Sequence, residues 1–450
     1  MCTEIDFGSC STEAQIINTL QTSIMLQFHP LSCSPMESAE MFSGDTRHFL
    51  IIGGGAAGFF AAIRAAEMNP NAKITILEQG KETLSKVRIS GGGRCNVTHA
   101  CFDPTELVKF YPRGKNALRG PFTRFCTGDT MEWFESRGVP LKIEEDGRVF
   151  PTSDQSQSII NCLEGAAAKA GITVLKHKKV AQLYPPEEPG QRWKVLTIKG
   201  ESYYGDALML ATGSSKFVWD LISHLGHTIV QPVPSLFTFN IALPWLHQLA
   251  GIAVPNAIVK IPKSKLETDG PLLITHWGLS GPAILKASAW GARELEAYNY
   301  DFDIKVNWLA GRSRESVTEQ LRQEKQENAR KKIDGRAPVE IPTRLWKAFC
   351  QQAGCTEDQR WADLRKDQLN KLAEFLCEHT FPVKGKSTFK DEFVTAGGVE
   401  LKEVNFKKFE SKIHDNLFFA GEVLNIDAVT GGFNFQAAWT GGWIVGTEVF

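Results

Sequence analysis

The chain has almost no net charge and no ordered pattern of cysteines. Its formal net charge is −1 over 450 residues, which excludes a global electrostatic attraction to nucleic acid or membrane and leaves only local attraction. Its ten cysteines stand at irregular spacings with no C-x-x-C pair. That pattern argues against a zinc knuckle and against a secreted disulfide framework. We therefore predict reduced thiols, a cytoplasmic protein and no metal site.

The chain also lacks a segment typical of a membrane span or a targeting peptide. Residues 49–63 are apolar but short, and residues 428–447 are uncharged but contain five glycines, which favours a packed segment over a lipid-facing helix. The first 44 residues contain no Lys or Arg, which argues against a signal or transit peptide. We expect residues 1–46 to be a disordered extension, and we expect no membrane partner.

What the chain does have is a glycine turn between an apolar run and a helical pattern. Residues 49–52 are β-prone, and Gly53, Gly55 and Gly58 follow in the spacing Gly-x-Gly-x-x-Gly. This is the strand–turn–helix of a dinucleotide-binding unit. The first glycine permits the tight turn, the second lets the backbone approach a diphosphate, and the third lets helix and strand pack closely. The diphosphate would bind the unpaired N–H groups at the helix start.

An acidic residue follows the next strand. The β-prone residues 73–77 end in Glu78, 25 positions after Gly53. A carboxylate there accepts hydrogen bonds from a ribose 2′-OH and repels a 2′-phosphate, so the nucleotide is predicted to be FAD or NAD, not NADP. The alternative, a glycine-rich turn in an ordinary α/β protein, leaves the register of strand, helix and acid unexplained.

The rest of the chain predicts a doubly wound α/β domain that is interrupted. Buried strands are expected at residues 171–175, 207–213 and 416–420, with a β-meander from Val180 to residue 198. After about residue 225, prolines punctuate short strands, which suggests a small barrel or sandwich. Residues 313–380 are helical and polar. We predict an α/β, Rossmann-type FAD-binding domain made of residues 47–225 and 391–450, split by an inserted β-barrel and helical domain at residues 226–390.

The second half of the domain favours FAD over NAD. Reduction places negative charge on the N1–C2=O edge of an isoalloxazine ring, and a helix start aimed there stabilises that charge. Gly431 and Gly432, before the final helix, offer unobstructed N–H groups, and Glu422 lies where it can bond ribityl hydroxyls. A plain NAD domain needs neither feature. No second Gly-x-Gly-x-x-Gly follows, so NAD(P)H is expected to dock transiently over the flavin.

Several further motifs carry a family resemblance. Residues 53–58, 89–96, 211–213, 275–282, 395–399, 420–427 and 431–434 resemble those of the BaiN/RdsA-like flavoproteins. The resemblance runs from about residue 47 to the C-terminus. It implies a split FAD domain with an inserted barrel and helical portion. It also implies a reductase of conjugated C=C bonds, since members act on bile acid intermediates or make dihydrouridine in ribosomal RNA. Asn425, Phe433 and Phe435 depart from the usual family residues.

The resemblance also implies which residues bind the cofactor. Glycines and polar residues at the ends of strands and in one glycine-rich loop would hold FAD: Gly53, Gly55, Ala57, Gly58 and Glu78; Arg88, Gly92, Gly93, Arg94 and Asn96; Val180, Thr212 and Gly213; and Gly421, Glu422, Gly431, Gly432 and Asn434. For the loop at residues 86–98, the residues alone indicate only close approach to a ligand, and structural packing is the alternative.

Two residues are candidates for catalysis. Reduction of an activated C=C needs a proton donor, and the thiol of Cys95 or the imidazole of His276 would serve. Arg94 is expected to lower the pKa of Cys95, which opposes the acid role. The alternatives are a buried cysteine that acts as a small hydrophobe and a hydrogen-bonded loop histidine.

These observations predict an FAD-dependent oxidoreductase that uses NAD(P)H to reduce an activated C=C bond. The partner is a small molecule or structured ribosomal RNA. Residues 312–347 hold ten Lys or Arg against six Asp or Glu, a local charge of 10 − 6 = +4. Residues 330–332 and Arg336 would then track phosphates, although a solvated helix face has the same composition. The alternatives are a dihydrouridine synthase acting on ribosomal RNA, a flavin sensor without turnover, and an amine oxidase that uses O₂.

Overall fold

The computed structural model describes residues 46–387 and 394–450. The predicted disordered extension therefore lies, but for Thr46, outside the described residues. A seven-stranded sheet has the order β20-β21-β22-β10-β1-β2-β6. Its parallel strands are β1 (His48–Ile52), β2 (Lys73–Leu77), β6 (Thr173–Leu175), β10 (Ala207–Leu210) and β22 (Leu417–Phe419). The short β20 (Val404–Asn405) and β21 (Glu410–Ser411) complete one edge.

The sheet confirms that two distant segments build the nucleotide domain. β22 pairs in parallel with β10, Leu417 opposite Leu208, although about two hundred residues separate them. All residues of β1, β10 and β22 are buried, as expected for parallel strands covered on both faces. β1 lies between β2 and β10. From β1 the chain first adds strands on one side, β2 and β6, and later on the other side, β10 and β22. Such a switch point, beyond the carboxyl ends of the strands, is where α/β sheets bind ligands.

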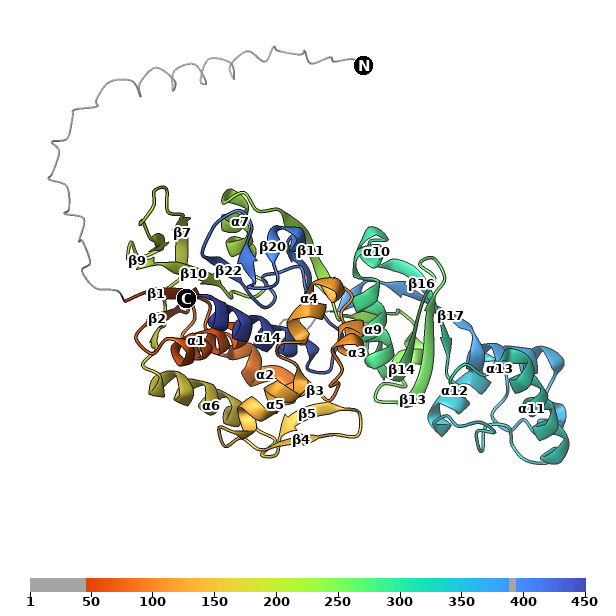
Figure 1. Ribbon diagram of the computed structural model, residues 1–450. Coiled ribbons are helices and arrows are strands. Elements are labelled where there is room, and N and C mark those ends of the chain that lie inside the picture. Colours follow the sequence, from red (N-terminus) through yellow and green to blue (C-terminus); the bar gives the residue numbers. More distant parts are fainter. Residues whose placement is uncertain (1–45, 388–393) are drawn as a thin grey trace, which may run out of the picture. The chain divides into compact units, whose positions relative to one another are not determined.

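Two helices from opposite ends of the sequence pack closely (Figure 1). α1 (Ala56–Met68) and α14 (Phe433–Glu448) approach through glycines of α14. A Cβ on Gly442 would lie 2.5 Å from the carbonyl oxygen of Ala57, and one on Gly446 would lie 2.5 Å from that of Ala61. Because both positions advance by four residues, the two helices run in the same direction.

The remaining elements of this domain are helices and short strands. They are α2 (Ser85–Gly93), β3 (Thr98–His99), α3 (Pro104–Leu107), η1 (Val108–Phe110), α4 (Lys115–Phe122), α5 (Thr127–Glu135), β4 (Leu141–Ile143), β5 (Arg148–Pro151), α6 (Ser156–Lys169), the meander β7 (Val180–Tyr184), β8 (Trp193–Thr197) and β9 (Ser202–Gly205), α7 (Lys216–His224) and η3 (Leu401–Glu403). The predicted loop at residues 86–98 differs. It begins as helix, and the helix breaks where Ser90, Gly91 and Gly92 leave helical geometry.

The inserted part is a barrel with helices. Its sheet has the order β17-β16-β13-β14-β15-β12-β18. The two edge strands, β17 and β18, are consecutive, with only Gly385 between them, and the N–H of Asn240 donates to the carbonyl of Gly385 at 3.1 Å. One stretch of chain therefore closes both edges, so the barrel, not the sandwich, is realised. The strands are β12 (Thr238–Asn240), β13 (Ala253–Ile261), β14 (Leu266–Thr275), β15 (Gly278–Ser280), β16 (Asp301–Asn307), β17 (His379–Lys384) and β18 (Lys386–Ser387).

Helices cover the barrel and extend it. They are α8 (Pro244–His247), α9 (Pro282–Trp290), α10 (Ala292–Ala297), α11 (Arg314–Glu327), α12 (Thr343–Gln352), η2 (Trp361–Asp363) and α13 (Lys366–Cys377). The barrel and these helices share one buried core, separate from the core of the nucleotide domain. Within the described residues, no helix is long and apolar enough to cross a bilayer.

A two-stranded connector joins the insert to the nucleotide domain. β11 (Ile229–Ser235) pairs antiparallel with β19 (Val394–Val399). A Cβ on Gly398 would lie 2.5 Å from the carbonyl oxygen of Val423, in the loop after β22. Gly398 thus lets the connector lie against that loop, and Gly397 lets β19 lie close to β11. The predicted boundary at residues 390–391 falls outside the described residues.

Candidate functional site

The first glycine turn has the geometry that its spacing predicts. Gly53 has φ +109°, and a Cβ there would lie 2.3 Å from the carbonyl oxygen of Ala211. A Cβ on Gly58 would lie 2.1 Å from the carbonyl oxygen of Gly53, so only glycine lets α1 pack this close. A Cβ on Gly55 would meet nothing within 4 Å. The open position is the one that the fingerprint assigns to the diphosphate.

Glu78 braces this turn from the end of β2. Its Oε2 accepts the N–H of Gly54 at 2.8 Å, and its Oε1 accepts the N–H of Gly80 at 2.6 Å. Each carboxylate oxygen keeps a second lone pair for a further donor. The N–H of Lys178 donates to the backbone carbonyl of Glu78 at 2.8 Å, which brings the start of β7 and the buried Val180 near this end of the sheet.

The ends of β10 and β22 lie beside each other. A Cβ on Gly213 would be 3.9 Å from Oε2 of Glu422, and Gly421 has φ +78°. Glu422 forms an ion pair with Lys86 of α2, a residue that the sequence did not single out. The hydroxyl of Thr212 is buried without a hydrogen-bond partner among the described residues.

The glycine-rich loop presents open backbone. Gly92 and Gly93 have φ +68° and +85°, and a Cβ on either would meet nothing within 4 Å. Arg88 donates to Oε1 of Gln157 at 2.7 Å and pairs with Glu82 at 3.7 Å. Its Nε, the atom that faces Glu82, is buried and has no hydrogen-bond partner within the described chain. The loop thus combines accessible N–H groups with an unused donor.

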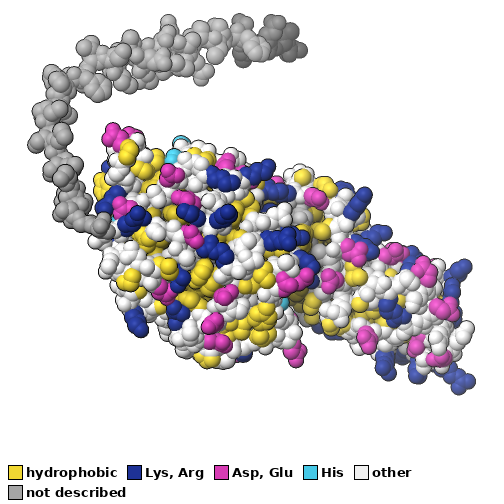
Figure 2. Space-filling model, viewed as in Figure 1, with side chains coloured by type: hydrophobic (Ala, Val, Ile, Leu, Met, Phe, Trp, Pro, Cys, Tyr) yellow, Lys and Arg dark blue, Asp and Glu magenta, His cyan; other side chains and the backbone are white. Residues whose placement is uncertain are grey.

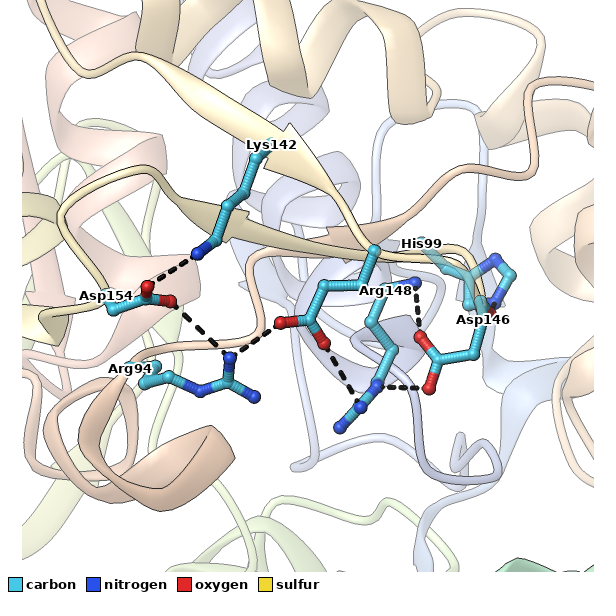
Figure 3. A network of polar contacts seen from close by, with 7 residues as sticks. Arg94, His99, Lys142, Asp146, Arg148 and Asp154 are labelled. Carbon is cyan, nitrogen blue, oxygen red and sulfur yellow. Dashed lines mark hydrogen bonds and ion pairs between the residues drawn. The ribbon is translucent and has the colours of Figure 1, made fainter. Parts of the chain in front are cut away.

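Arg94 belongs to a network of charged side chains (Figure 3). Its guanidinium pairs with Glu144 at 2.6 Å and Asp154 at 3.4 Å, and it lies 3.9 Å from the centroid of the Phe150 ring. Lys142 pairs with Asp154 on the other side. The hydrogen bond that Arg94 donates to Glu144 raises the pKa of Arg94. The resemblance implies that Arg94 binds the cofactor. In the structure, two carboxylates compensate the positive charge of this arginine.

The expected effect of Arg94 on Cys95 is wrong. Cys95 is completely buried, and burial raises the pKa of its thiol to about 12, with a hydrogen bond to Ser90 opposing that shift. Arg94 points to the carboxylates on the neighbouring hairpin, so its charge does not favour a thiolate. The structure matches the alternative for Cys95, a buried small hydrophobe.

Asn96 joins the glycine-rich loop to the start of α14. With its amide oriented so that both ends are satisfied, its oxygen accepts the N–H of Gly432 at 3.0 Å and its nitrogen donates to the carbonyl of Thr98 at 2.9 Å. Gly431 and Gly432 have φ +130° and +90°. The N–H of Gly432 is therefore engaged, and the unpaired N–H groups are those of the first helical turn.

Asn434 is hydrogen-bonded within the loop before α14, whereas His276 is exposed. The Asn434 amide accepts from the N–H of Ala428 at 2.9 Å and donates to the carbonyl of Ala428 at 3.2 Å. It thereby closes the loop before α14. His276 is exposed on the turn between β14 and β15, far in sequence from the glycine turns.

An aromatic stack that the sequence did not indicate lies beside the start of α14. The ring of Phe433 stacks on Phe110 at 4.2 Å and on His99 at 4.6 Å. A ring nitrogen of His99 bonds the carbonyl of Asp146 at 3.1 Å, and burial lowers the pKa of this histidine. His99 directly follows the glycine-rich loop, and that position was the available signal.

A buried ion pair ties the insert to the loop before α14. Arg113 binds both carboxylate oxygens of Asp427, which is fully buried and also accepts from Ser235 at 2.9 Å. Arg113 donates in addition to the carbonyl of Ala289 at 2.7 Å. Burial raises the pKa of Asp427, and Arg113 opposes that shift. Four segments distant in the sequence meet here, a contact that no local pattern indicates.

The described residues fit an FAD molecule. Open glycine positions follow β1 and occupy the glycine-rich loop, and buried unpartnered polar atoms belong to Thr212 and Arg88. The sequence matches the family described as HI0933-like protein Rossmann domain over residues 47–448. The chain belongs to the HI0933-like family. With its nucleotide-binding turn and its second glycine-led helix, it is an FAD-dependent oxidoreductase.

Individual proteins of known sequence or structure are similar to the chain. A ribosomal RNA dihydrouridine synthase of Haemophilus influenzae is 27% identical over 402 residues, which cover 87% of this chain and 95% of that protein. A 3-dehydro-bile acid delta(4,6)-reductase of Clostridium scindens is 26% identical over 410 residues, 88% of this chain and 97% of that protein. The solved 3-ketosteroid-delta4-(5alpha)-dehydrogenase of Rhodococcus jostii is 11% identical with a TM-score of 0.47, covering 92% and 99% of the chains.

Proposed function

We propose that the protein reduces a C=C bond conjugated to a carbonyl and draws its electrons from NAD(P)H. The observation that carries the proposal is similarity over nearly the full length to two proteins whose names share this chemistry. Dihydrouridine is uridine with its ring C=C reduced, next to a carbonyl. A delta(4,6)-reductase of a 3-dehydro bile acid likewise removes C=C bonds conjugated to a ketone.

The two helix starts suit the two ends of an extended cofactor. Gly442 is the tenth residue of α14 and packs at the level of Ala57, the second residue of α1. At a rise of 1.5 Å per residue, α14 therefore begins roughly 14 Å before that level, and α1 only about 2 Å before it. When bound, FAD supplies the hydride for the reduction. The start of α1 would hold the diphosphate, and the start of α14 would stabilise negative charge on the ring.

The reduction also requires a proton at the neighbouring carbon. Of the two candidates, the buried thiol of Cys95 has no surface to offer a substrate. His276 is exposed, and its imidazole is the side chain most often used as a general acid or base. We therefore keep His276 as the proton donor of the proposal.

The test begins with the visible spectrum of the purified protein and with anaerobic bleaching of its flavin by NADH and NADPH. The proposal is supported if a steroid enone or a uridine-containing RNA reverses the bleaching. One C=C bond should then be reduced for each NAD(P)H oxidised. His276→Gln should slow turnover while leaving flavin bleaching unchanged, and His224→Gln, on an exposed face of α7, is the matched control.

Three other results would contradict the proposal. Flavin that NAD(P)H does not reduce indicates a sensor. Rapid reoxidation by O₂ with release of peroxide and no reduced product indicates an oxidase. Protein that stays colourless after reconstitution with FAD contradicts the cofactor itself.

A further inference from the structure

Two adjoining hollows lie on the outer face of the inserted domain. The larger, of about 420 Å³, is formed where β13, β14 and β16 meet the start of α11 and the end of α13. The smaller, of about 250 Å³, continues along β13 and β14. The two share Lys260, Glu267 and Lys305, so they form one groove, which we call the basic groove.

The basic groove carries an excess of positive charge. Five of its side chains are basic and two are acidic: Lys260, Lys265, Lys305, Arg312 and Arg314, against Glu267 and Glu378. Each acid pairs with one base. Lys260 lies 2.9 Å from Glu267, and Arg314 lies 2.6 Å from Glu378.

Three positive charges therefore remain without an acidic partner in the described chain. Arg312 donates to the neutral Oε1 of Gln320 at 2.7 Å. This contact fixes the side chain but leaves its charge uncompensated. For Lys265 and Lys305 no described carboxylate lies within 4.0 Å. A hollow with three uncompensated cations favours a polyanion, because the attraction is local even though the chain as a whole carries −1.

The neighbouring side chains indicate what kind of polyanion fits. Asn307 and Ser313 add polar groups, and the apolar residues that line the groove are aliphatic, with no aromatic ring among them. Bases are read by stacking on aromatic rings and by hydrogen bonds to their edges, whereas phosphates need only cations and polar donors. The groove is thus suited to a sugar–phosphate backbone and not to base recognition.

We propose that the basic groove binds the phosphate backbone of an RNA and positions that RNA for reduction of one of its bases. The inference rests on the proposed reductase function, because an RNA base is a substrate only if the enzyme reduces such a C=C bond. It places the contact at β13, β16 and the start of α11. Residues 330–336, where the sequence placed it, also hold cations without a described carboxylate within 4.0 Å, namely Arg330, Lys331 and Arg336, and they stay the alternative in the test. Lys332, in that stretch, is paired with Asp358. Figure 2 likewise shows Asp and Glu among the Lys and Arg side chains over the inserted domain.

The test compares three double variants of the holoenzyme in filter binding to purified bacterial ribosomal RNA, over a range of salt. Lys305→Gln/Arg312→Gln should weaken binding about tenfold or more and reduce the log–log salt slope by about two, one for each lost phosphate contact. Lys169→Gln/Lys199→Gln removes the same charge from exposed sites of the nucleotide domain and should leave affinity unchanged. Arg330→Gln/Arg336→Gln tests the region that the sequence favoured.

Separate readouts distinguish this inference from the proposed function. Flavin bleaching by NAD(P)H and reduction of a steroid enone should be unchanged in Lys305→Gln/Arg312→Gln. If RNA binding is unchanged in that variant, or is lost only in Arg330→Gln/Arg336→Gln, the groove is overturned while the reductase stands. If wild type binds poly-glutamate and not RNA, the partner is an acidic protein and the inference is overturned.

Discussion

The contact between α1 and α14 yields a sharp prediction for a single methyl group. A Cβ on Gly442 would lie 2.5 Å from the carbonyl oxygen of Ala57 and 3.2 Å from the backbone nitrogen of Ala61. Both atoms are backbone, so no side-chain rotation relieves the clash. Gly442→Ala must separate the helices by several tenths of an ångström. Overpacking of this kind costs about 1–3 kcal/mol.

A matched substitution isolates that cost. Gly165 lies inside α6, and a Cβ there would meet nothing within 4 Å. Gly165→Ala should therefore raise the free energy of unfolding by about 0.5–1 kcal/mol, the ordinary gain of alanine over glycine in a helix. Gly442→Ala receives the same gain and loses more to the clash. We expect it to lower the free energy of unfolding by about 1 kcal/mol.

Urea unfolding, followed by tryptophan fluorescence with and without FAD, measures both effects. Because we propose that FAD binds at the starts of α1 and α14, Gly442→Ala should also weaken FAD binding several-fold, whereas Gly165→Ala should not. If Gly442→Ala is as stable as Gly165→Ala and binds FAD normally, the two helices are not held at the distance that we describe.

Three further predictions follow from buried groups. Arg113→Met leaves the carboxylate of Asp427 buried without its cation and should cost about 3–5 kcal/mol in urea unfolding; adding Asp427→Asn should recover part of that loss, and no recovery would contradict the pairing. His48 is buried, and burial with nearby cations lowers its pKa from 6.5 to about 4. The unfolded chain therefore takes up the proton first, so stability is full above pH 6.5 and falls by roughly 3 kcal/mol as the pH drops to 4, a slope that His48→Gln should flatten. Cys95→Ala should leave flavin content and turnover within about twofold of wild type, and a large loss of turnover with intact FAD would restore the thiol to the reaction.

The sequence was sufficient for elements whose signal is local. Buried parallel strands form continuous apolar runs, so β1 and β2 were predictable from residues 49–52 and 73–77. The conformations of Gly53 and Gly58 follow from a spacing that only one strand–turn–helix geometry explains. β22 was predictable from the same kind of apolar run, at residues 416–420.

Barrel closure and charge pairing were not predictable, because their determinants are distant in sequence. A barrel and a sandwich have the same alternation along each strand, and here the barrel is identified by the continuity of β17 and β18 and by the hydrogen bond from Asn240 to Gly385. Glu144 and Asp154 lie 50 and 60 positions beyond Arg94. Adjacent to Cys95 in sequence, Arg94 suggested a shared environment, but consecutive side chains at a positive φ, +62° at Cys95, point in different directions.

Direct contacts join the insert and its connector to the loop before α14. Arg113 holds Asp427 at the start of the loop that leads into α14, and Ser235 at the end of β11 shares that carboxylate. The connector also lies against Val423 through Gly398. The insert and its connector therefore contact the loop before α14 at two places, Asp427 and Val423. Under our proposal, an RNA held by its backbone on the insert presents one base to the flavin from a defined position, so positioning and reduction involve different parts of the chain.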